Sequence, residues 1–100
     1  MEALTSKQKK YLKAQAHPLK ALVQIGKSGV TDESIRSIHT AISQHELLKV
    51  KFIAFKEEKD SFVEAILEGA NAQFVSMIGH ILTLYRQHDE QEKRKYKLPK

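Results

Sequence analysis

Two glycines three positions apart, with a lysine between them, are the feature of this sequence with the clearest chemical potential. The segment GKSG, residues 26–29, follows the apolar run 21–25 and precedes a helix-like pattern that opens at Thr31. Glycine lets a backbone approach a ligand closely, and the start of a helix presents unpaired N–H groups to an anion. Such a loop can clamp a phosphodiester backbone through its amides, with Lys27 adding a positive charge.

The same spacing also fits an ordinary tight turn, and both interpretations require conformational freedom at the two glycines. Asp32 and Glu33 stabilise the start of the following helix, but their charges would repel a phosphate. The segment does not match G-x-x-x-x-G-K-[ST], so the sequence does not support nucleotide hydrolysis of the P-loop type. From the residues alone, the turn and the phosphate cradle both stay open.

The other reactive residue types form no known catalytic or metal-binding motif. The sequence has no cysteine, which excludes disulfides, thiolate catalysis and Cys-type zinc sites. Its five histidines show no HExxH spacing, and His39 and His45 do not share the i,i+4 spacing of a helical zinc site. Ser28 lacks the G-x-S-x-G elbow of serine hydrolases. We therefore expect no enzymatic activity, no cofactor and no metal.

Positive charge is concentrated at the two ends of the chain. The net charge is +5, and residues 1–20 carry five lysines against one glutamate. The first helix is expected to open at a capping box formed by Thr5 and Gln8 and to stop before Pro18. Its outer side holds Lys7, Lys9, Lys10 and Lys13, and Lys20 follows it. A one-sign surface of this kind suits an anionic partner such as nucleic acid, although a solvated helix face is the alternative.

Hydrophobic periodicity predicts a compact α/β domain with the order α-β-α-β-α-β-β, in which helices cover a sheet. Strands are expected at residues 21–25, 47–55, 74–78 and 81–86, the last two joined by a Gly79-His80 turn. The second of these strands alternates so that Lys49 and Lys51 face away from its buried side. Helices are expected to begin at the caps Thr31 and Asp60.

One hundred residues suffice for a single domain. No apolar run approaches the roughly 20 residues that span a bilayer, and the N-terminal region lacks the apolar stretch of a signal peptide. We therefore expect a cytoplasmic protein. Binding to an anionic membrane is disfavoured, because the first helix has a weak apolar face of alanines and glutamines. Residues 87–100 are expected to form a polar, partly mobile tail.

Four segments, in their order and spacing, give the sequence a specific resemblance. They are LTSKQKKYLKAQAHPLKALVQIGKSGVT (4–31), HELLKVKF (45–52), IGHILTLYR (78–86) and KYKLP (95–99). The chain resembles the bacterial YhbY-like proteins, single copies of the CRS1-YhbY (CRM) RNA-binding domain, over residues 1–97. The resemblance implies a four-stranded mixed sheet, similar to the C-terminal domain of a bacterial translation initiation factor. One departure is His80, where relatives can carry lysine.

The resemblance also implies RNA binding without a catalytic residue or cofactor. Bacterial members of the family are associated with precursors of the large ribosomal subunit, and plant-organelle members with group II intron splicing. Carried over by position, the RNA-contacting loop is Gly26, Lys27, Ser28 and Gly29. Further RNA-binding residues are expected to be Lys7, Lys10, Lys13, Lys20, Lys51 and Arg86. We expect a protein that is a monomer when free and contacts ribosomal RNA or a pre-large-subunit particle, without a small-molecule substrate or a membrane. The alternative is a protein-interaction module whose basic ends dock on an acidic or ribosomal protein.

Overall fold

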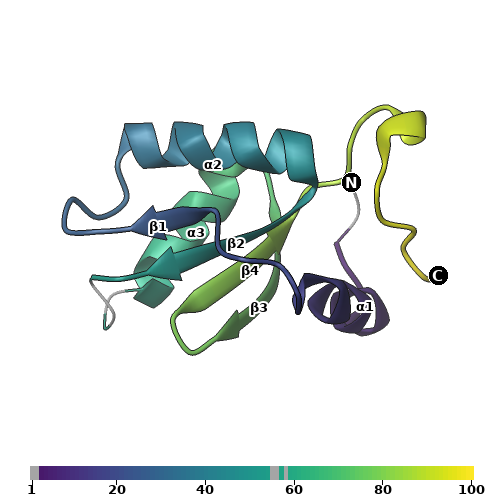
Figure 1. The fold of residues 1–100 in the computed structure, drawn as a ribbon, viewed down its shortest axis with the longest axis horizontal. Coiled ribbons are helices and arrows are strands. Elements are labelled where there is room, and N and C mark those ends of the chain that lie inside the picture. Colours follow the sequence, from purple (N-terminus) through teal and green to yellow (C-terminus); the bar gives the residue numbers. More distant parts are fainter. Residues whose placement is uncertain (1–2, 55–56, 58) are drawn as a thin grey trace.

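The fold is a mixed sheet with helices on both of its faces, seen here in a computed structural model that describes residues 3–54, 57 and 59–100 (Figure 1). Its elements are α1 (Ser6–Ala16), β1 (Val23–Ile25), α2 (Asp32–His45), β2 (Leu47–Phe52), α3 (Lys59–Ala70), β3 (Gln73–Ile78), β4 (Ile81–Tyr85) and the short 3₁₀ helix η1 (Gln91–Lys93). The described strands form a four-stranded sheet in the order β1-β2-β4-β3. β1 pairs with β2 in parallel, and the other two pairings are antiparallel. The predicted element order and mixed sheet are confirmed.

Local capping chemistry sets the start of the first two helices. In α1 the Thr5 hydroxyl accepts from the Gln8 amide at 3.1 Å, and the Gln8 side chain accepts from the Thr5 amide at 3.0 Å. This is the predicted capping box. Thr31 and Ser34 exchange equivalent bonds at the start of α2, at 2.7 and 3.1 Å. Both caps satisfy N–H groups that a helix start leaves without an intrahelical partner.

The alternation along β2 divides the interior into two cores. Leu48, Val50 and Phe52 face α2 and α3 and are fully buried in the main core. Leu47 points to the opposite face and belongs to a second core with α1 and Tyr85. The two cores follow from the two-residue period of a strand, which sends neighbouring side chains to opposite faces. The predicted register of β2 is confirmed.

Several boundaries differ from the prediction. β1 begins at Val23 rather than at residue 21. The linker before it is held to β2 by the Lys49 side chain and by a backbone bond, from the Leu22 amide to the Lys49 carbonyl. α3 begins at Lys59, so Asp60 lies in its first turn and is not its cap. β2 ends at Phe52, and the predicted continuation to residue 55 and the charged turn at 56–59 fall partly on residues 55, 56 and 58, outside the described part.

Residues 87–100 are in contact with the domain through both side chains and backbone. Tyr96 and Leu98 pack against the second core. The Gln8 side-chain amide donates to the Pro99 carbonyl at 3.0 Å. The expected partial mobility of this segment stays a prediction.

Ionisation of Tyr85, in the second core, is expected to lower the stability of the protein at alkaline pH. Its side chain is 0% exposed, and burial, followed by the nearby Glu46 charge, raises its pKa to about 12. In the unfolded chain a tyrosine ionises near pH 10, so between about pH 10 and 12 the unfolded state holds fewer protons than the folded state. We expect the free energy of unfolding to fall across this window, by on the order of 2 kcal/mol for this group.

Urea unfolding at a series of pH values measures this loss. Tyr85→Phe removes the titrating group and keeps the ring, so the alkaline decline should be shallower in the variant. Part of it remains, because burial and Glu46 also raise the pKa of Tyr96. Parallel stability curves for the variant and the wild type above pH 10 would rule out Tyr85 as the cause.

Candidate nucleic-acid interface

The GKSG segment forms a hydrogen-bonded turn at the end of β1. The Gly29 amide donates to the Gly26 carbonyl at 3.0 Å, which places Lys27 and Ser28 at the tip, where both are exposed. Together with the first turns of α2, the loop lines a hollow of about 260 Å³. The loop therefore presents a lysine and a hydroxyl to solvent beside the start of a helix, as the sequence predicted.

The two glycines of the loop have different structural roles. Gly29 is buried and has a φ of 70°, a conformation that favours glycine. Gly26 does not have positive φ, and a Cβ built on it would meet only the Ile53 Cδ1 atom at 3.8 Å, an ordinary contact. The interpretation that both glycines need conformational freedom is therefore wrong for Gly26. The fold therefore does not require a glycine at position 26. Close approach of a ligand to the backbone there would require one.

The first turn of α2 combines favourable and unfavourable features for an anion. Asp32 and Glu33 are both exposed there, and Glu33 lines the same hollow as the loop. The positive end of the helix dipole favours a phosphate, and these carboxylates oppose it. Lys27 at the tip is the residue of the loop best placed to hold a phosphate.

One face of the sheet is only partly covered. α1 packs over the end of the sheet formed by Leu47, Val75 and Tyr85. Farther along the same face the register aligns a row across all four strands of the described sheet, from Gln24 in β1 through Lys51 and Ile81 to Ile78. Lys51 is exposed in this row, and Ile78 is 58% exposed. We call this row, with the neighbouring Ile53, the open sheet face.

Lys49 lies on the same side of β2 as Lys51 but is engaged with the backbone. Its ammonium donates to the carbonyls of Leu19 at 3.1 Å and His17 at 3.4 Å. These bonds hold the linker between α1 and β1 against the sheet. Of the two lysines on this side of β2, Lys51 is therefore the more exposed one.

The lysines of α1 divide into two groups. Lys7, Lys10 and Lys13 are exposed, as predicted. Lys9 is partly buried, with its ammonium 5.8 Å from the centre of the Phe74 ring, a cation–π distance that gives it a packing role. α1 and the GKSG loop lie toward opposite ends of the molecule, whose longest extent is 38 Å (Figure 1). The open sheet face lies between them.

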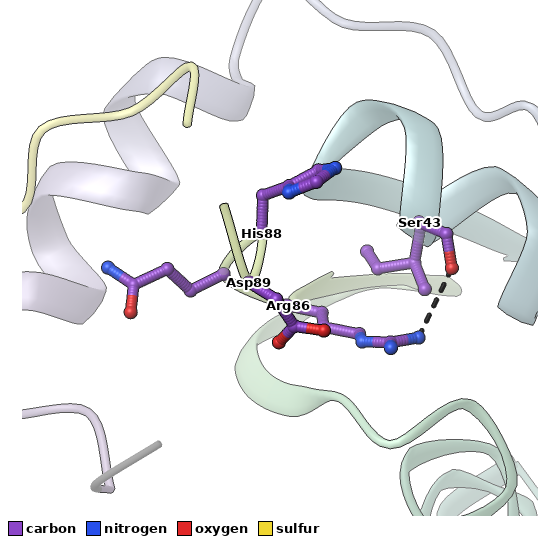
Figure 2. Close-up of a pocket in the computed structure, with 6 residues that line it drawn as sticks. Ser43, Arg86, His88 and Asp89 are labelled. Carbon is purple, nitrogen blue, oxygen red and sulfur yellow. Dashed lines mark hydrogen bonds between the residues drawn. The ribbon is translucent and has the colours of Figure 1, made fainter. Parts of the chain in front are cut away.

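Arg86 lies away from the open sheet face. It follows β4, and its guanidinium reaches α2, where Nη1 is 3.2 Å from Ser43 Oγ (Figure 2). The same Nη1 is 3.1 Å from His39 Nε2. A cavity of about 140 Å³ beside it is also lined by His88 and Asp89. The structure therefore does not bring Arg86 together with the GKSG loop or Lys51, and an RNA contact by Arg86 stays a separate prediction.

Glu46 is a structurally important residue that the sequence analysis missed. It is the only residue between α2 and β2, has a φ of 63° and is 1% exposed. Its carboxylate accepts hydrogen bonds from the backbone amides of His88, at 2.7 Å, and Lys95. Glycine is the usual residue at such a helix end. A glutamate at this position, directly between a helix and a strand, was the signal in the sequence that its side chain could have a structural role.

Two features are absent from the described residues. No helix among them is both long and apolar enough to cross a bilayer. They also contain no cluster of His, Cys, Asp or Glu suited to hold a metal ion.

Comparison with known proteins places this fold in a family. Residues 4–86 match the CRS1 / YhbY (CRM) domain. The chain is 37% identical to the "Probable RNA-binding protein YqeI" of Bacillus subtilis, covering 96% of this chain and 99% of that protein. It is 42% identical to an "RNA-binding protein" of Haemophilus influenzae, covering 90% and 92%.

A solved structure agrees with the sequence comparisons. The solution structure of the protein SAV1595 from Staphylococcus aureus superposes with a TM-score of 0.80 at 32% identity, covering 96% of this chain and 99% of that one. Family match, sequence identity and fold agree over nearly the whole length. This chain belongs to the CRS1 / YhbY (CRM) domain family.

Proposed function

We propose that this protein binds RNA without catalysing a reaction, through a surface that runs from the GKSG loop across the open sheet face to the lysines of α1. Relatives that align over nearly the full chain are named as RNA-binding proteins. The family resemblance supports the finer part of the proposal, that the RNA is ribosomal RNA or a pre-large-subunit particle during ribosome assembly.

The observation that carries the proposal is the position of the open sheet face. Lys51 is exposed on it, between a loop tip that presents Lys27 and a helix that presents Lys7, Lys10 and Lys13. Extended RNA that crosses this face meets Lys27 at the loop, Lys51 on the sheet and the exposed lysines of α1. A compact ligand cannot do so, because the loop and α1 lie toward opposite ends of the molecule.

The chemistry of this surface predicts the type of binding. Lysines contact phosphates as point charges, and contacts to the backbone carry no direct sequence information. Ile53 and Ile78, which are 50% and 58% exposed, offer apolar contact to sugars or bases. We therefore expect strong salt dependence and little sequence preference. Specificity then comes from the shape of the RNA or from a ribosomal partner protein.

The loop is tested by titrating a structured ribosomal RNA fragment against the wild type, Lys27→Ala and Gly26→Ala across a salt series. Lys27→Ala should bind more weakly, with a log–log salt slope shallower by roughly one, because one phosphate contact is lost. Gly26→Ala should fold normally, because the added Cβ meets only ordinary contact. A weaker affinity in that variant then reports close approach of RNA to the backbone.

The choice of variants follows from the conformation of the loop. Gly29 is unsuitable, because a substitution at its positive φ strains the fold itself. Coincident binding curves for all three proteins would show that the loop is a turn that does not contact RNA. If the wild type shows no affinity for RNA but binds an acidic ribosomal protein, the alternative of a protein-interaction module replaces the proposal.

A further inference from the structure

A cavity of about 220 Å³ lies beside the start of β2, outside the surface described above. β1 is shorter than β2, and its register begins at Val23 with Val50, so before Val50 the linker from α1, and not a strand, lies along that edge of β2. There the Leu22 amide donates to the Lys49 carbonyl at 3.2 Å. The linker through Leu19 and the C-terminal segment at Tyr96 form the other walls. The side of the cavity is therefore a strand edge that the linker covers only in part.

The lining of this cavity combines an apolar floor with a rim of one charge sign. Leu19, Leu47 and Leu48 line it, although Leu47 and Leu48 are themselves buried in the two cores, and Leu22 adds a side chain that is 59% exposed. The polar and charged residues that line it are Lys20, His45, Lys49, Lys95 and Tyr96. None of the described residues that line the cavity is acidic. An occupant that matches this lining has an apolar part and a negative charge.

The neighbouring charges are already arranged for an anionic occupant. The Lys49 ammonium is held by two carbonyl oxygens, and a lysine carries three donors, so one N–H remains beyond those two bonds. Lys20 and Lys95 are exposed at the rim. Close to Lys95 lies an acidic side chain, the buried Glu46. Its carboxylate oxygens accept hydrogen bonds from the backbone amides of His88 and Lys95.

We infer that this cavity takes one unpaired nucleotide of the bound RNA, with the base against Tyr96 and the adjoining phosphate between Lys20 and Lys95. The inference rests on the proposed RNA binding and adds a base-binding subsite to it. The volume is below the roughly 300–1,000 Å³ of sites for drug-sized ligands, which suits a single base. An aromatic ring stacks on any base, and lysines bind the phosphate.

The test uses adenosine 5′-monophosphate and ribose 5-phosphate as probes. The binding of each is monitored by the amide chemical shifts of the protein in ¹H–¹⁵N NMR spectra. The nucleotide should shift the amides of Leu22, Leu47 and Tyr96 saturably. Ribose 5-phosphate should bind about tenfold more weakly, because the base–aromatic contact is missing. Tyr96→Leu should reduce nucleotide binding to that lower level, whereas Tyr96→Phe, which keeps the ring, should retain it.

A second arm measures the affinity of each variant for a single-stranded RNA oligonucleotide. Tyr96→Leu should weaken RNA binding about tenfold, an effect that adds to that of Lys27→Ala if the two sites are separate. Because Tyr96 packs in the second core, Leu22→Glu provides an independent variant: it changes an exposed side chain at the cavity mouth and should weaken binding by repelling the phosphate.

The outcomes separate this inference from the proposed function. RNA binding that Lys27→Ala weakens while Tyr96→Leu and Leu22→Glu leave it unchanged overturns the subsite alone. Equal affinity for the nucleotide and ribose 5-phosphate also overturns it, because the cavity then binds only an anion. Saturable binding of a glutamate-rich peptide in preference to the nucleotide assigns the cavity to a protein partner. A wild type with no affinity for RNA overturns both proposals.

Discussion

We expect Glu46→Ala to lower the free energy of unfolding by about 2–3 kcal/mol and to release the C-terminal segment. In the wild type the buried carboxylate accepts from the amides of His88 and Lys95. Hydrogen bonds to a charged group are worth more than neutral ones, and a buried donor left without its acceptor costs the full desolvation free energy. Alanine removes both acceptors and keeps the unfavourable positive φ.

Two further substitutions separate the backbone from the side chain at this position. Glu46→Gly relieves the positive φ, which costs a non-glycine residue roughly 1–2 kcal/mol, and should be less destabilising than Glu46→Ala. Glu46→Gln keeps an acceptor without the charge and should lie between the wild type and Glu46→Ala. In both Glu46→Gln and Glu46→Ala the pKa of Tyr96 should fall, because Glu46 contributes to raising it.

Urea unfolding measures the stability change, and hydrogen exchange of the His88 and Lys95 amides measures release of the segment. Glu64→Ala is the matched control, since it removes an exposed carboxylate from α3 and should change stability by less than about 0.5 kcal/mol. If Glu46→Ala were as stable as this control, the contacts of Glu46 would not hold the segment in place.

The second large effect is expected on RNA affinity. Replacing Lys7, Lys10 and Lys13 together by glutamine should weaken binding to a ribosomal RNA fragment about a hundredfold near 0.1 M salt and make the salt slope shallower by up to three. The fold should persist, because glutamine and lysine have similar helix propensities. The substitution also removes like-charge pairs spaced i,i+3 along α1, which oppose the helix.

The matched control removes the same number of charges elsewhere. Lys93, Lys97 and Lys100 are all exposed in the C-terminal segment. Replacing these three by glutamine changes the net charge equally but leaves the lysines of α1 intact. If this control weakens RNA binding as much as the α1 variant, net charge drives the association. A much smaller effect assigns the contact to α1.

The positions of the cations show how far the sequence predicts the candidate site. Helical periodicity alone puts Lys7, Lys10 and Lys13 on one exposed side, and strand alternation puts Lys51 opposite the buried face of β2, both confirmed by the structure. Periodicity does not distinguish Lys9, which packs over Phe74, or Lys49, which holds the linker. Those roles depend on residues brought close only by folding.

The sequence by itself determined the element order, the caps at Thr5 and Thr31 and the register of β2, because capping bonds and side-chain periodicity act between residues near one another in the chain. Tertiary structure alone decided the rest. It placed the GKSG loop and α1 toward opposite ends of the molecule, turned Arg86 toward α2, and buried Glu46 beneath the C-terminal segment. These outcomes depend on contacts between distant segments, and local patterns do not specify which segments will meet.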